Sequence, residues 1–130
     1  MNPSYGINKD TDYDFDTAIE KVTAALKEEG FGVLTEIDVK ATLKKKLDVD
    51  FPRYTILGAC NPPIALKALN ADRGIGLLLP CNVVVAEREA GGTTVSAISP
   101  KAMFAVVDDP AMTPMVEDVE ARLTRAIAAT

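Results

Sequence analysis

The sequence contains no histidine, and only two of its 130 residues are cysteine. Histidine is the side chain most often used as a general base near neutral pH and as a zinc ligand, so its absence removes the commonest group for both tasks. The two cysteines, Cys60 and Cys81, are too few for a disulfide scaffold and are not spaced as a metal-binding pair. We therefore identify no catalytic residue and expect reduced thiols, no metal site and no cofactor.

Long apolar runs and basic surfaces are also scarce. The longest apolar stretch, residues 74–86, is broken by Pro80 and Asn82 and falls short of the ~20 residues that a membrane span needs. The net charge is −5, and the one basic cluster, at residues 44–46, is followed at once by acidic residues. Such a chain lacks the basic face that neutralises nucleic-acid phosphates. With no leader sequence at its start, we expect a soluble, cytoplasmic protein with neither a nucleic-acid nor a membrane partner.

Length and composition indicate one domain over residues 1–130, since 48% of the residues are hydrophobic and 25% charged. Hydrophobic residues recur at helical spacing over residues 14–29, where Asp14 is placed as N-cap and Gly30 as the stop. A second long helix is expected over residues 113–128, beginning at Thr113-Pro114. Alternating or β-branched stretches predict strands at residues 5–9, 31–37, 53–60, 82–88 and 93–98.

Short sequence signals connect these elements. Asn61-Pro62-Pro63 predicts a helix start, because asparagine caps well and prolines in the first turn remove only donors without an intrahelical partner. Gly74 is expected to end that helix, and residues 77–79 to approach the next strand as an extended segment. Gly91-Gly92 predicts a hairpin turn. Together these elements predict an α+β two-layer sandwich, with a mostly antiparallel sheet and both long helices on one face.

Apolar residues occupy both faces of the two strands expected at the centre of the sheet. In the strand after Pro80, Val83 and Val85 point one way while Val84 and Ala86 point the other. Helices on a single side cannot cover both faces. Either the small helices and loops wrap around the second face, or a second copy of the chain covers it. We favour the homodimer.

Three stretches resemble one known family. "GFGVLTEIDV", "ILGACNPPIA" and "LLLPCNVVV" occur in the order found in the bacterial and archaeal DUF302 family, and the likeness continues through "SPKAMFAVV" and the last helix. The resemblance covers nearly the whole chain. It implies a β-α-β(4)-α, TBP-like fold and a tendency to form homodimers. It implies no activity, because the function of the family is unassigned. Some relatives are joined to electron-transfer or sulfur-related modules, which hints at thiol chemistry.

One corner of the fold collects the residues that could carry chemistry. A helix between two sequential strands usually delivers them as neighbours, so we predict Cα atoms of Cys60 and Cys81 within roughly 10 Å. Cys60 precedes a helix N-terminus, which favours a thiolate. Buried packing is the competing interpretation, since free cysteine is among the most buried residue types. The proposed ligand-binding residues of this corner are Cys60, Asn61, Pro62, Leu79, Pro80 and Cys81.

Three functions remain open on this evidence, and whether the protein is an enzyme stays undecided. The first is a small soluble homodimeric binding or interaction module, with its pocket at the Cys60/Pro80-Cys81 corner. The alternative is a thiol-dependent redox or sulfur-carrier protein that uses Cys60 or Cys81. The third is a purely structural partner of another chain.

Overall fold

The sheet is the frame of the molecule. The computed structural model describes residues 1–130, and its five strands lie in the order β1-β5-β4-β3-β2 with every neighbouring pair antiparallel. The strands are β1 (Gly6–Thr11), β2 (Gly32–Asp38), β3 (Tyr54–Cys60), β4 (Cys81–Glu87) and β5 (Thr93–Ile98). The helices are α1 (Phe15–Glu28), α2 (Val39–Leu47), α3 (Pro62–Ala71), α4 (Pro100–Phe104) and α5 (Thr113–Ala128), with short 3-10 helices η1 (Arg73–Leu78) and η2 (Pro110–Met112).

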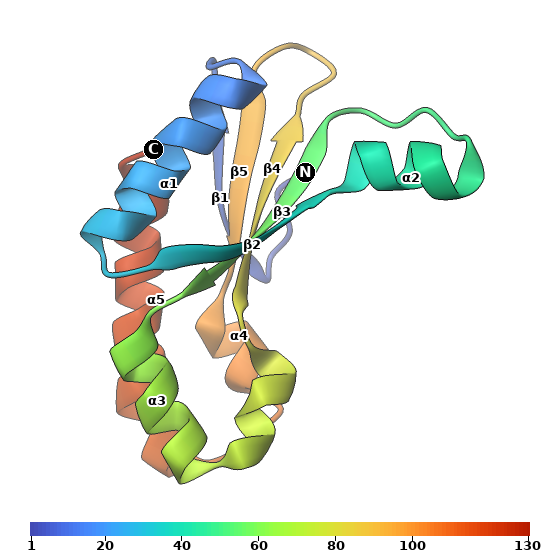
Figure 1. The fold of residues 1–130 in the computed structure, drawn as a ribbon. Coiled ribbons are helices and arrows are strands. Elements are labelled where there is room, and N and C mark those ends of the chain that lie inside the picture. Colours follow the sequence, from blue (N-terminus) through green and yellow to red (C-terminus); the bar gives the residue numbers. More distant parts are fainter.

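The two long helices, α1 and α5, pack side by side on one face of the sheet (Figure 1). The apolar side of each helix packs on every second residue of the strands. This follows because hydrophobic residues repeat about every 3.6 positions in the helices and every two positions in the strands. The fully buried centre includes Val22 and Leu26 of α1, Leu123 of α5, and Val83 and Val85 of β4. The predicted α+β sandwich, with its antiparallel sheet and both long helices on one face, is confirmed.

Caps and turns form where the sequence predicts them. Asp14 accepts a hydrogen bond of 2.8 Å from the backbone N–H of Thr17 and so caps α1. Gly30 has φ +87° just after α1, a conformation that favours glycine. Gly91 and Gly92 also have positive φ and join β4 to β5 as the predicted hairpin.

Two segments differ from the expectation. Helix α3 ends at Ala71 rather than at Gly74, because the Asp72 side chain accepts a hydrogen bond of 2.8 Å from Gly74 N–H and starts a new helical turn. Leu77 and Leu78 therefore lie in η1 and not in an extended approach to β4.

The Leu79–Pro80 peptide is cis, and β4 begins at the next residue, Cys81. Helix α4 and η2 were not expected, although each begins with a capping residue followed by proline, Ser99-Pro100 and Asp109-Pro110; both pack beside α5.

Helix α2 projects from the sheet as an arm (Figure 1). Asp38 caps its first turn by accepting from Ala41 N–H at 2.9 Å, and Asp48 ends it in the left-handed conformation. None of its residues is buried. We call residues 39–53, which comprise α2 and the loop to β3, the arm.

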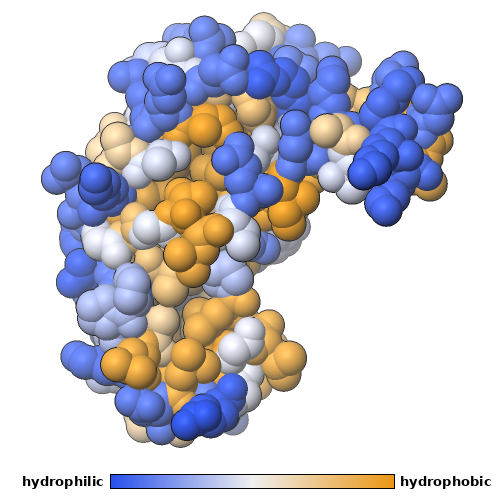
Figure 2. Space-filling view, viewed as in Figure 1, coloured by the Kyte–Doolittle hydropathy of each residue, from blue (hydrophilic) through white to orange (hydrophobic).

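The sheet face opposite α1 and α5, which we call the open face, lies in a recess. The arm projects on one side of this recess, and η1 with α4 projects on the other (Figures 1 and 2). Val84 and Ser96 pair directly on the open face, and Ile56 of β3 lies beside Val84. No helix of the structure is both long and apolar enough to cross a membrane.

Candidate functional site

The two cysteines meet at one corner of the sheet. Cys60 ends β3, Cys81 begins β4, and Ala59 is the register partner of Cys81. Opposite residues of antiparallel strands have Cα atoms about 4.5–5.5 Å apart, and consecutive Cα atoms are about 3.8 Å apart. The Cα atoms of the two cysteines therefore lie within about 10 Å, as the sequence predicts. Both cysteines are free.

Cys81 is held in its neutral form. The residue is 6% exposed and belongs to the main core, packed among aliphatic side chains. Burial, with a smaller contribution from the neighbouring Cys60, raises the pKa of the Cys81 thiol to about 11. A thiol in this state is a poor nucleophile near neutral pH. The core-packing interpretation therefore fits Cys81 better than the reactive one.

An apolar hollow adjoins the corner, between α3, α5 and the end of the sheet. Cys60, Asn61, Leu79 and Cys81 all line it, and twelve of its fourteen lining residues are hydrophobic. Its volume is only about 40 Å³. That space is comparable to the share of one water molecule in the liquid, about 30 Å³. As it stands, the hollow accepts a small apolar group and nothing larger.

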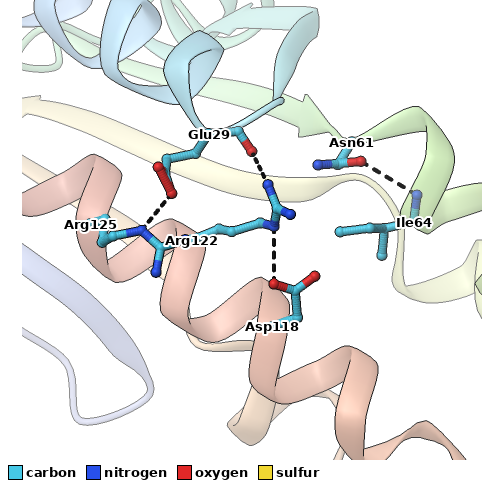
Figure 3. Close-up of polar contacts among 6 residues, drawn as sticks. All are labelled: Glu29, Asn61, Ile64, Asp118, Arg122 and Arg125. Carbon is cyan, nitrogen blue, oxygen red and sulfur yellow. Dashed lines mark hydrogen bonds and ion pairs between the residues drawn. The ribbon is translucent and has the colours of Figure 1, made fainter.

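Asn61 connects the corner to the ends of two helices. Its side-chain oxygen accepts from Ile64 N–H at 3.4 Å, which caps α3 (Figure 3). Arg122 of α5, which like Asn61 lies near Gly30, donates to the carbonyl oxygen of Glu29 at 3.1 Å and pairs with Asp118. Asn61 thus acts as a structural cap in a region where α1, α3 and α5 converge.

The two prolines of the predicted site lie apart from the hollow. Pro62 is exposed in the first turn of α3 and does not line it. Pro80 lies on the open face against Gly58, where an added Cβ would be 2.8 Å from the proline Cγ. The structure therefore brings together four of the six predicted residues, and Pro80 belongs to a different cavity.

That second cavity lies on the open face and has a volume of about 590 Å³. Val84 and Asn82 of β4 and Ser96 and Ile98 of β5 line it, with Pro80 among the residues around them. Pro80 was selected from the sequence, but the four strand residues were not. The available signal was the alternation of β4 and β5, which places polar Asn82 and Ser96 on the same face as Val84.

No group of three or more His, Cys, Asp or Glu side chains is arranged so that it could hold a metal ion. Some acidic side chains instead cap helices, as Asp14 does, and others form ion pairs, as Asp16 does with Arg53 at 2.7 Å.

The described fold is α+β, with a five-stranded antiparallel sheet and two free cysteines at one corner. The model of the domain of unknown function DUF302 matches residues 7–130, and the chain belongs to this family. A crystal structure of an uncharacterized conserved DUF302 protein from Bacillus stearothermophilus is similar, with 31% identity, a TM-score of 0.90 and coverage of 98% of each chain. No curated protein matches the sequence. The resemblance seen in the sequence is confirmed.

Proposed function

We propose that this DUF302 protein is a binding module that works as a homodimer. The observation that carries the proposal is the unburied arm together with the strand before it. Five of the eleven large hydrophobic side chains that are exposed lie between residues 34 and 51. These five, which we call the arm patch, are Leu34, Ile37, Leu47, Val49 and Phe51. These exposed apolar side chains fall within 18 consecutive residues, which supports an interaction surface in this segment.

Two further features support a second copy as the partner. An isolated helix shorter than about 12 residues is marginal in water, so the nine-residue α2 gains stability from a packing partner. Helix α2 also carries four lysines and no acidic residue, so the rest of the chain carries −9 against a total of −5. Within the arm, Lys44 pairs with Asp48 and Asp50. Lys40, Lys45 and Lys46 remain to complement the acidic body of another copy.

Light scattering after size exclusion tests the homodimer. We expect about twice the 13.9 kDa mass of the chain. Ile37→Lys places a charge in the arm patch at an exposed position and should shift the protein toward the monomer. Leu66→Lys, at an exposed position of α3, is the matched control and should leave the dimer intact. A monomer at high concentration, or equal effects of the two variants, contradicts the proposal.

Within the proposed binding function, the corner hollow has room for only part of a ligand. It is lined by Cys60, Asn61, Leu79 and Cys81 and has room for a small apolar group. A ligand of ordinary metabolite size needs several hundred Å³. Of the two sites, the open-face cavity therefore has the appropriate volume for such a ligand.

The thiol-dependent function is the second candidate, favoured by the adjacency of two free cysteines along one hollow. Native alkylation with iodoacetamide at neutral pH, read by mass spectrometry, separates it from the binding function. The raised pKa and the burial of Cys81 predict no labelling there. Rapid labelling of Cys60, with loss of a sulfur-transfer or redox activity in Cys60→Ser, would favour the thiol function instead.

A further inference from the structure

The side chains that line the open-face cavity are uncharged. None of its thirteen lining residues has an acidic or basic side chain, although a quarter of the residues in the chain are charged. Its volume of about 590 Å³ lies within the range of small-molecule sites, about 300–1,000 Å³. Met1 brings the one formal charge of the lining residues, its α-amino group, which lies near the Asp10 carboxylate and is balanced by it. A charged ligand entering this space would therefore lose solvation without gaining an unpaired opposite charge. The lining therefore selects for an uncharged occupant.

The floor of the cavity is rigid. It consists of the pair Val84 and Ser96 on neighbouring central strands, with Asn82 and Ile98 next to them. Strands β4 and β5 are each paired on both sides, so hydrogen-bonded ladders hold these positions. A site built on central strands keeps its geometry better than one built on loops.

The wall formed by the N-terminal segment is tied to this floor. The Ser96 hydroxyl donates to the side-chain oxygen of Asn8, whose amide nitrogen donates to the carbonyl oxygens of Pro3 at 2.9 Å and Gly6 at 3.2 Å. A side chain at Gly6 would meet Ser96 Oγ at 2.8 Å. Glycine at this position lets the segment lie close over β5.

The ends of the cavity supply aromatic rings. Tyr54 begins β3 on one side of the floor, and Tyr5 precedes β1 on the other. Phenol rings offer apolar faces for stacking and one hydroxyl each. Asn82 adds an amide that can both donate and accept. Apolar contacts thus dominate, and a few polar groups are available to orient a ligand.

We propose that the open-face cavity binds an uncharged, ring-containing small molecule with one or two hydrogen-bonding groups. The inference rests on the proposed binding function and does not require the homodimer. The cavity is distinct from the corner of Cys60 and Cys81, and Pro80 is its only residue among the six selected from the sequence.

A matched pair of probes tests the chemical class. The neutral planar 2-naphthamide and the anionic 2-naphthoate share one ring system and differ in charge. Their fluorescence can be followed directly because the chain has no tryptophan. We expect Kd for 2-naphthamide to be at least tenfold lower than Kd for 2-naphthoate. Equal affinities, tighter binding of 2-naphthoate, or no binding of 2-naphthamide would overturn the proposal.

Two variants locate the binding site. Val84→Lys places an ammonium group on the floor and should raise Kd for 2-naphthamide at least tenfold while lowering Kd for 2-naphthoate. Tyr5→Ala removes an exposed ring and should raise Kd for 2-naphthamide about threefold even if Val84→Lys does not fold. Leu66→Lys, at an exposed position of α3 outside the cavity, is the control. Unchanged affinity in Tyr5→Ala, or equal loss in the control, refutes the location.

Light scattering on the same samples separates this inference from the homodimer. A monomer that binds 2-naphthamide and responds to the variants supports the cavity and refutes the dimer. If the affinity for 2-naphthamide instead falls as self-association increases, the second copy of the chain occupies the cavity. That result would refute the small-molecule proposal.

Discussion

Asn61 packs against Gly30, so the cap of α3 touches the second residue after the end of α1. A Cβ on Gly30 would lie 2.8 Å from the side-chain nitrogen of Asn61. The contact fixes the cap next to the corner of the two cysteines. The same asparagine is 9% exposed, so its polar atoms have little access to solvent.

Replacing Asn61 tests the contribution of the cap. Asn61→Ala should lower the free energy of unfolding by about 1 kcal/mol, the usual effect of losing an N-cap side chain. Urea denaturation followed by circular dichroism measures the change. Asn82→Ala, at an exposed position of β4, is the control and should stay within about 0.5 kcal/mol of the parent protein. Equal effects of the two substitutions would show that Asn61 does not stabilise α3 as a cap.

The two hairpin glycines allow a paired comparison. Gly91 and Gly92 both have positive φ, so an alanine at either position costs about 1 kcal/mol in backbone strain. A Cβ at Gly91 meets nothing within 4 Å, whereas one at Gly92 collides with the carbonyl oxygen of Thr11. Gly92→Ala should therefore lower the melting temperature clearly more than Gly91→Ala. Similar melting temperatures would mean that the turn does not lie against Thr11.

Alkaline pH should destabilise the protein through Cys81. The thiol has a pKa of about 11 in the folded protein and an ordinary value of 9.0. Between these values the unfolded chain loses the proton and the folded chain keeps it, so stability falls as pH rises. The loss should approach about 2–3 kcal/mol by pH 11.

Comparison with Cys81→Ala isolates this contribution, because tyrosines and lysines also titrate in the same range. The difference in free energy of unfolding between the parent protein and Cys81→Ala should be constant below pH 9 and shrink above it. A difference that stays constant up to pH 11 would show that Cys81 ionises freely in the folded state.

Self-association should weaken with salt if the basic arm binds the acidic body. Sedimentation equilibrium at low and high ionic strength should show a dimer Kd that rises several-fold, because salt screens exposed charges. Lys45→Glu in α2 should weaken the dimer further. Lys27→Glu in α1 makes the same change in net charge away from the arm and should leave Kd nearly unchanged. A Kd independent of both salt and Lys45 would exclude the electrostatic contribution.

The sequence predicted the fold well because its local signals agree with one another. Asp14 and Asn61 each specify a cap through a side-chain oxygen, and the structure has both caps. Gly30 and the Gly91-Gly92 pair specify a helix end and a turn through positive φ, and the structure has these too. The predicted end of α3 at Gly74 was wrong. Asp72 caps a new 3-10 helix, so residues 73–78 form a second helical segment.

The candidate site was less predictable. Adjacent strands brought Cys60 and Cys81 together, which sequential order is enough to suggest. The side of the sheet on which Pro80 lies depends on its contact with Gly58, and no sequence spacing reports that contact. The open-face cavity also depends on the N-terminal segment, which reaches β5 through Asn8 and Ser96. Such long-range contacts are absent from local patterns.

The arm has a consequence for how this protein can diversify. Asp38 and Thr55 still pair at the base of the arm, so the ladder between β2 and β3 is complete without it. None of the α2 side chains contributes to the core. Substitutions, insertions or deletions in this segment should therefore be tolerated by the folded body. Related proteins can vary the arm in length and sequence and so recruit different associates, while the sheet and its two long helices stay the same.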